Sequence, residues 1–205
     1  NIWVASFRDG RIERRGADGV LKKEHETDSH IEDLLVSADG DLWSAGWFEN
    51  GAGEIRLYRG DELVHRYDDD LQRPVAIAEA SRERIVAVDR LARRLRSFDL
   101  LGSTGPQSGQ IFLEPVDLCP DGTGGFWVAD PGRGGIVRVD RDLEEILFVA
   151  LPQVLGLTLD REDGRIWAAG AEGVSTLDLD GRILTSASLG RRPVKVELLH
   201  EPEIP

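Results

Sequence analysis

Two carboxylates and an ammonium group recur at one position of a repeated segment, and they are the residues of this chain best suited to chemistry. Asp33, Asp117 and Lys195 share that position, and Glu32 precedes the first of them. Carboxylates together with backbone carbonyls and water suit Ca²⁺ or another divalent cation. The two acids with Lys195 opposite them suit the polar end of a ligand, whereas a solvated channel that only tolerates charge is the simplest explanation. All three explanations remain open.

These residues belong to a repeat of about 41 residues that runs through the chain. Its marker is a short apolar strand whose central residues are spaced by 40, 43, 41 and 40 positions. The five copies are Ile2-Trp3-Val4-Ala5, Leu42-Trp43-Ser44-Ala45, Ile85-Val86-Ala87-Val88, Phe126-Trp127-Val128-Ala129 and Ile166-Trp167-Ala168-Ala169. A period of this length, built from strands and Gly/Asp turns, indicates a β-propeller.

Each full copy predicts four antiparallel strands, and the carboxylates lie on the first of them. The opening copy lacks that first strand, and residues 193–198 repeat its Pro-Val pattern at the other end of the chain. We therefore expect an all-β, five-bladed β-propeller, a single domain over 1–205, whose ring closes by pairing 193–198 with 1–6. Because side chains alternate along a strand, the first strands place Asp33, Asp117 and Lys195 along a central channel.

The run Pro115–Gly122, followed by Gly125–Asp130, resembles the repeats of the NHL and gluconolactonase-type propeller superfamily. The copies around Trp43 and Trp167 are also similar to virginiamycin-lyase-type and sensor-type propeller repeats. The resemblance implies a propeller along the whole chain, but it rests on turn and packing residues. Gluconolactonase-type enzymes hold an axial divalent metal with carboxylate and asparagine ligands, and Val116 stands where that family has its metal-binding aspartate.

A virginiamycin-type lyase would need a catalytic histidine near the axis. The chain contains His25, His30, His65 and His200, and none of them lies on a motif that matches that family. The crossover that contains His25 and His30 is rich in acids, as is the one at Asp68–Asp70, and such side chains can ligate Zn²⁺ or Mn²⁺. A solvated acidic crossover is the favoured interpretation.

Two hairpin loops at the face where propellers usually bind ligands stand out by composition. The loop Gly46–Gly53 contains Trp47, Phe48 and Asn50. Exposed aromatic residues are typical anchors for protein or sugar contacts, but Trp47 folding back over its own blade is an equal alternative. The hairpin of the third copy contains Arg93 and Arg94. They form either a basic patch or ion pairs with neighbouring acids, and the ion pairs are the favoured alternative.

The composition restricts the kinds of partner that this chain is expected to bind. Lys and Arg number 25 against 38 Asp and Glu, a formal net charge of −13. Such a surface repels phosphate backbones and anionic bilayers, so we expect neither nucleic acid nor a membrane as partner. Cys119 is the single cysteine, which precludes an intrachain disulfide and leaves the compartment open. We expect a monomer.

These features favour a binding scaffold without chemistry of its own, which presents one loop face and the axial channel to a protein or a small-molecule ligand. The alternative is a metal-dependent hydrolase or lyase of the gluconolactonase or virginiamycin-lyase type, with its carboxylate site at Asp33 and Asp117. No catalytic residue and no definite cofactor is assigned, beyond a divalent cation at these two acids. A sensor segment of a larger receptor is the third alternative.

Overall fold

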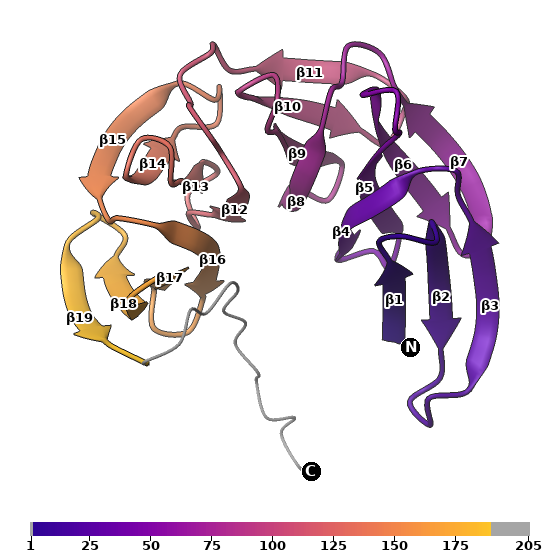
Figure 1. The fold of residues 1–205 in the computed structure, drawn as a ribbon, viewed down its shortest axis with the longest axis horizontal. Helices are drawn as coiled ribbons and strands as arrows, with labels where there is room; N and C mark the ends of the chain where they lie inside the picture. Colours follow the sequence, from indigo (N-terminus) through magenta and orange to yellow (C-terminus); the bar gives the residue numbers. More distant parts are fainter. Residues whose placement is uncertain (1, 190–205) are drawn as a thin grey trace. The chain divides into compact units, whose positions relative to one another are not determined.

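A computed structural model describes residues 2–189 of the chain, and these residues form β-structure throughout. The chain divides into two compact units, Asn1–Pro115 and Val116–Pro205, and each is described by itself (Figure 1). Within the described residues, no helix is long and apolar enough to cross a membrane.

The first unit contains three antiparallel sheets whose strands follow one another in chain order. The first sheet has three strands, β1 (Ile2–Ser6), β2 (Arg11–Arg15) and β3 (Leu21–Glu26). The second contains β4 (His30–Val36), β5 (Leu42–Trp47), β6 (Gly53–Arg59) and β7 (Glu62–Tyr67). The third contains β8 (Pro74–Ser81), β9 (Arg84–Asp89), β10 (Arg94–Asp99) and β11 (Thr104–Gln107).

The second unit repeats the four-stranded arrangement in two sheets. One contains β12 (Asp117–Pro120), β13 (Phe126–Asp130), β14 (Gly135–Val139) and β15 (Glu145–Ala150). The other contains β16 (Val154–Asp160), β17 (Arg165–Gly170), β18 (Gly173–Asp178) and β19 (Ile183–Ala187). We call β4, β8, β12 and β16, the first strand of each four-stranded sheet, the leading strands.

The sheets confirm the expected all-β class and the five repeated units, and residues 2–189 supply no leading strand for the first of them. The expected pairing of 193–198 with 1–6 involves positions outside the described residues, so ring closure stays a prediction. The single domain over 1–205 also stays a prediction, since the two units are described separately.

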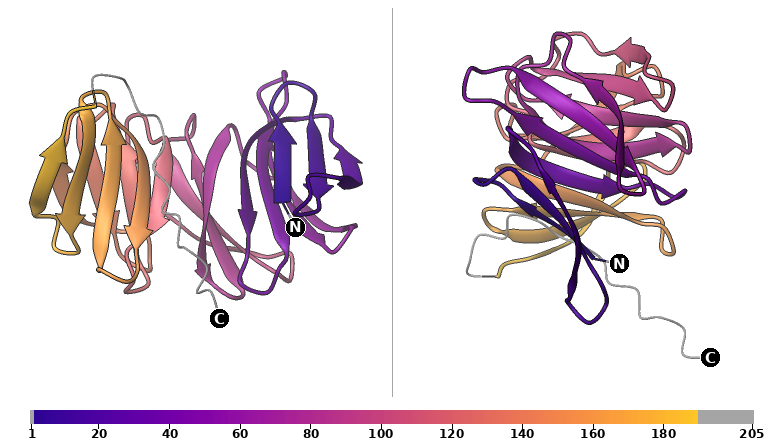
Figure 2. Two further views of the ribbon diagram at one scale, coloured as in Figure 1. Left: turned by 90° about the horizontal axis from the view of Figure 1, so that it is seen from below. Right: turned by 90° about the vertical axis from the view of Figure 1, so that its right-hand side faces the viewer.

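The marker tryptophans pack between neighbouring sheets of one unit. Trp43 is 1% exposed and lies in a cluster with Ile55 of its own sheet and Ile85 of the next sheet. Trp127 is fully buried in the second unit against residues of both sheets, including Ile166. Figure 2 shows the twisted sheets of each unit face to face. The tryptophan of the repeat therefore serves packing, as large apolar side chains between sheets usually do.

One end of each sheet brings together two kinds of connection, and we call it the loop end. There the hairpin after the second strand meets the crossover that leads from the preceding sheet into the leading strand. In the first unit, the Arg90 N–H donates to the Arg73 carbonyl at 2.9 Å. In the second unit, the Ala171 N–H donates to the Gln153 carbonyl at 3.1 Å. These backbone bonds hold the hairpin against the crossover at the loop end of each unit.

Candidate functional site

Asp33 ties two leading strands of the first unit together. One carboxylate oxygen accepts the N–H of Leu34 at 2.9 Å, and the other accepts the N–H of Ile77 at 2.9 Å. Leu34 belongs to β4 and Ile77 to β8, so a single side chain joins neighbouring sheets. Hydrogen bonds from backbone N–H groups to a carboxylate are among the stronger ones in proteins.

Asp117 repeats this geometry in the second unit. Its two oxygens accept the N–H of Leu118 at 2.9 Å and the N–H of Leu157 at 2.8 Å, which joins β12 to β16. The equivalent geometry in both units gives these aspartates a structural role. Cation binding at Asp33 and Asp117 stays a prediction because each lies in a separate unit, and Lys195 lies outside the described residues.

Trp47 folds back over its own blade. Its indole N–H donates to a carboxylate oxygen of Glu32 at 2.8 Å, and the Arg73 guanidinium lies 4.6 Å from the centre of the ring. The same Glu32 oxygen pairs with Arg73 at 2.9 Å. Glu32, expected in the axial channel, is thus engaged in a contact among β4, β5 and the crossover before β8. Of the two alternatives for Trp47, an exposed anchor or a side chain folded over its own blade, the structure has the second.

His30 extends this cluster toward the first sheet. Its ring lies 4.7 Å from that of Trp47 and stacks at 5.2 Å on Phe7, which is 42% exposed. The Nδ1 atom of His30 lies 3.2 Å from the Phe7 carbonyl. Because a carbonyl only accepts, Nδ1 donates in this contact and Nε2 is the remaining acceptor of the neutral ring.

The other candidates of the Gly46–Gly53 loop stabilise its turn. Asn50 accepts the N–H of Ala52 at 3.0 Å, and the Gly51 N–H donates to the Phe48 carbonyl at 2.8 Å. Gly51 has a φ of 86°, which a residue with a side chain rarely adopts. The guanidinium of Arg66 lies 5.3 Å from the ring centre of Phe48. The turn around Asn50 is therefore held by its own polar groups, and Phe48 by a cation–π contact with Arg66.

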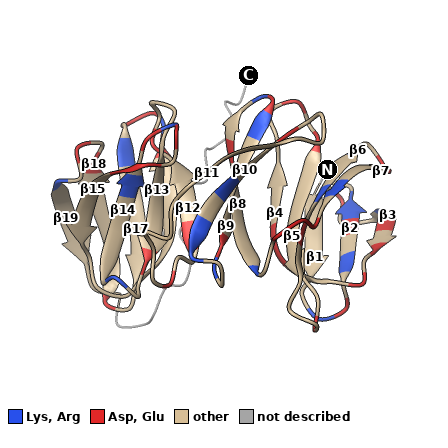
Figure 3. Cartoon of the chain, turned by 90° about the horizontal axis from the view of Figure 1, so that it is seen from above, with Lys and Arg blue, Asp and Glu red and all other residues tan. Residues whose placement is uncertain are grey.

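Two arginines of the basic hairpin, Arg90 and Arg94, pair with acids. Figure 3 marks the basic positions of β10 in blue. Arg94 contacts the Asp70 carboxylate at 2.6 Å and the Asp70 carbonyl at 2.7 Å. The hydrogen bond from Arg94 lowers the pKa of Asp70. Arg90 pairs with Glu114, while Arg93 lies exposed on the turn with a φ of 57°.

The acidic crossovers hold no metal-like cluster. Within residues 2–189, no group of three or more His, Cys, Asp or Glu side chains could hold a metal ion. His25 packs its ring 4.9 Å from that of Tyr58, and burial lowers the pKa of His25. Asp68 lies 3.3 Å from Arg66 and Asp70 is bound by Arg94. These side chains are occupied by packing and ion pairs.

Buried Asp89 was missed in the sequence, and it shapes the crossover that carries Arg73. It is completely buried at the end of β9 and accepts the backbone N–H groups of Gln72 at 3.1 Å and Arg73 at 2.9 Å. Asp130 occupies the equivalent end of β13 and is also fully buried. The sequence does contain a signal for this role, because an aspartate directly follows the marker strand in two copies of the repeat.

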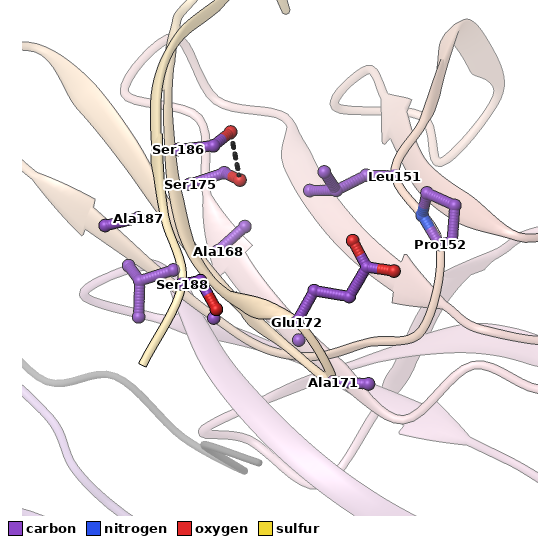
Figure 4. A pocket seen from close by; sticks show the side chains of 12 residues that line it. Leu151, Pro152, Ala168, Ala171, Glu172, Ser175, Ser186, Ala187 and Ser188 are labelled. Atoms are coloured by element: carbon purple, nitrogen blue, oxygen red, sulfur yellow. Dashed lines mark hydrogen bonds between the residues drawn. The ribbon is translucent and has the colours of Figure 1, made fainter. Parts of the chain in front are cut away.

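A pocket at the loop end of the second unit was also missed. It has a volume of about 610 Å³ and lies between the crossover after β15 and the strands β17, β18 and β19 (Figure 4). Leu151 and Pro152 come from the crossover, Ala168 from β17 and Glu172 from the turn before β18. Ser175 and Ser186, on the paired strands β18 and β19, line it further.

The pocket exists because its lining residues are small. Gly170 and Gly173 border the turn, and Ala or Ser occupies most of the facing strand positions. Gly173 has a φ of 142°, and a Cβ there would lie 1.9 Å from the Ala187 carbonyl oxygen. Only glycine therefore allows β18 and β19 to pair this closely at the rim of the pocket. No spacing motif marks such a set of small residues.

Comparisons with known proteins agree on the fold. No protein-family model matches the chain, and no curated protein matches its sequence. Two structures of virginiamycin B lyase from Staphylococcus aureus each match with a TM-score of 0.81 and 17% identity, over 94% of this chain and 69% of the lyase. One is selenomethionine-substituted, and the other is a catalytically inactive histidine-to-alanine variant with quinupristin. A streptogramin B lyase structure matches with a TM-score of 0.80 and 19% identity, over 94% and 67% of the two chains.

This likeness shows that the chain has the β-propeller fold found in virginiamycin B lyase, which confirms the fold that the sequence resemblance implied. It gives no support to the expectation of a scaffold without chemistry, because the similar structures are named as lyases. Their names do not mention a metal, so the expected metal dependence gains no support either.

Proposed function

We propose, from the virginiamycin-lyase-type fold and from the geometry of the second unit, that this chain binds a small organic ligand at its loop end. The observation that carries the proposal is the pocket of about 610 Å³ beside β18 and β19. Binding sites for small molecules are commonly concave, about 300 to 1,000 Å³ in volume, and mostly apolar with a few polar groups. Leu151, Pro152 and Ala168 supply apolar wall, and Glu172, Ser175 and Ser186 supply polar groups.

The test blocks the pocket without changing the core. Ser186 is exposed on β19, so Ser186→Phe should fill the pocket from its rim. Thr185→Phe is the matched control, since its side chain points to the other face of the strand. Both changes remove one cross-strand hydroxyl pair, Ser175 with Ser186 at 2.9 Å or Thr176 with Thr185 at 2.7 Å.

The readout is an NMR screen of small fragments on the isotope-labelled chain. We expect hits that shift the backbone amide signals of 171–175 and 186–188, that are lost in Ser186→Phe and that persist in Thr185→Phe. Hits that shift other regions only, or that bind equally well to both variants, would contradict the proposal.

A second candidate function is a lyase that acts on quinupristin or a related compound. The fold likeness supports it, as does the orientation of His30, whose Nδ1 is held by the Phe7 carbonyl while Nε2 remains to take up a proton. The assay is the loss of quinupristin, followed by liquid chromatography with and without EDTA. The activity should disappear in His30→Ala and persist in His65→Ala. An unchanged quinupristin peak with the unsubstituted chain would reject this candidate and leave the ligand-binding proposal standing.

A further inference from the structure

The pocket contains one charged side chain and it is negative. Among the described residues that line the pocket, Glu172 is the only Asp, Glu, Lys, Arg or His. Within the same part of the chain, its carboxylate has no hydrogen-bond or ion-pair partner. Figure 4 shows the side chain of Glu172 near Leu151 and Pro152. A bound cation would therefore meet a negative charge that no side chain of residues 2–189 pairs with, and these residues would repel an anion.

The remaining polar groups suit a donor-rich ligand group. The hydroxyls of Ser175 and Ser186 share one hydrogen bond of 2.9 Å, which leaves lone pairs on these oxygens to accept further hydrogen bonds. Ser188 adds another hydroxyl to the lining. A primary ammonium group carries three donors, so it can bond the Glu172 carboxylate and still donate to a hydroxyl.

The apolar residues that line the pocket indicate the chemistry of the rest of the ligand. Leu151, Pro152, Ala168 and Val174 offer apolar surface, which favours a hydrocarbon body. The described lining contains no Phe, Tyr or Trp, the residues that bind quaternary ammonium ions by cation–π contacts. A primary ammonium, which hydrogen-bonds, is therefore favoured over a quaternary one, which cannot.

We infer that the pocket selects a primary amine with an apolar body, held by Glu172 at its ammonium end. This inference rests on the proposed ligand-binding function and adds the chemical class of the ligand. It does not depend on the second candidate function, because His30 lies in the other unit.

The experiment uses four probes of similar size: 2-phenylethylamine, its N-trimethylated form, 2-phenylethanol and 3-phenylpropanoate. Dissociation constants are measured by NMR titration on the whole chain, with the shifts of 171–175 and 186–188 as the readout. We expect the primary amine to bind about tenfold more tightly than the alcohol and the trimethylated amine, and the anion to bind most weakly.

Two variants assign the selectivity. Glu172→Gln keeps the size of the side chain and should bring the amine within about twofold of the alcohol. Glu144→Gln is the matched control, because Glu144 is also exposed but lies before β15, at the opposite end of that strand from Leu151. It should leave the tenfold preference intact. Melting curves of both variants establish that each remains folded.

The outcomes separate this inference from the function on which it rests. Equal binding of amine and alcohol in the pocket would overturn the selectivity for a cation and leave the binding site in place. A preference for the amine that survives in Glu172→Gln would overturn the role of Glu172. Failure of every probe and of the fragment screen to shift these amides would overturn both proposals.

Discussion

The carboxylate of Asp33 accepts the backbone N–H of Ile77 at 2.9 Å, and so links the leading strands of two consecutive sheets. Asp117 and Leu157 form the same link at 2.8 Å in the second unit. The apolar contacts between the sheets have no preferred direction of their own. A directed hydrogen bond at this position fixes how far one leading strand shifts along the next.

Replacement of Asp33 should therefore lower stability. Asp33→Ala removes the acceptor of the Leu34 and Ile77 N–H groups, and we expect the free energy of unfolding of the first unit to fall by about 1 to 3 kcal/mol. Asp33→Asn retains one acceptor oxygen and should lose less. Urea unfolding followed by circular dichroism measures both. Asp39→Ala, in an exposed turn, is the control and should change the free energy by less than about 0.5 kcal/mol. Equal stability of Asp33→Ala and this control would disprove the structural role.

Asp121 should make the stability of the second unit depend on pH. The residue is 1% exposed; burial raises its pKa, but hydrogen bonds from Thr123, Arg138 and Gly125 outweigh burial, and the net pKa is lowered from 3.8. A lowered pKa in the folded state stabilises the protein above about pH 4, and this contribution disappears as the pH falls through the folded pKa.

The measurement is urea unfolding at pH 6, 4 and 3. Asp121→Asn should be less stable than the unsubstituted chain at pH 6, because Arg138 loses its charged partner at 2.8 Å. The difference should shrink at pH 3. Asp163→Asn, on an exposed turn, should show little change at any of these pH values. A difference between Asp121→Asn and the unsubstituted chain that stays constant from pH 6 to pH 3 would show that Asp121 has no lowered pKa.

The contact of Trp47 with Glu32 and Arg73 should be cooperative. Trp47→Phe removes the N–H bond to Glu32 but leaves a ring beneath Arg73, and should cost about 1 kcal/mol. Glu32→Gln removes the negative charge of the side chain that both Trp47 and Arg73 contact. A double-mutant cycle should give a coupling energy of about 0.5 kcal/mol or more. Strict additivity of the two single changes would mean that the hydrogen bond contributes nothing to stability.

Cys119 should resist modification while the chain is folded. The side chain is 5% exposed, and burial, followed by the nearby carboxylates of Asp117 and Asp121, raises the pKa of its thiol well above the usual value. Since the thiolate is the reactive form, iodoacetamide at pH 8 should leave the native protein unmodified and react in urea. Mass spectrometry reads the result directly, because the chain has one cysteine. Rapid modification of the native protein would contradict this burial.

Much of the fold was predictable because the repeat has a physical period. Trp43 and Trp127 recur at equivalent positions, and large apolar side chains at the centre of a strand pack between sheets. Alternation along β4 predicted which face of the strand carries Asp33. It did not predict that Asp33 binds the N–H of Ile77, because this contact depends on the offset between two sheets. The offset between two packed sheets is not encoded in any local pattern of one strand.

The candidate site was less predictable for a related reason. The contact between Trp47 and Glu32 depends on the backbone conformation of a loop. A loop with several glycines can adopt many conformations, so the sequence does not specify one. The pocket depends on the absence of bulk at positions such as Ala168 and Ser186, and small residues are common elsewhere in the chain. A charged residue is recognised directly in a sequence, whereas an unfilled volume between small residues is visible only in the folded structure.

The aspartate at the leading strand does not occur in every copy. Ala76 stands at its position in β8, between the copies that contain Asp33 and Asp117, and it has no carboxylate to offer. The division of the chain between Pro115 and Val116 follows this copy. Each carboxylate link therefore serves one unit only. In native-state hydrogen exchange, the amides of β4 and β8 should open as one block, and those of β12 and β16 as another, each with its own opening free energy.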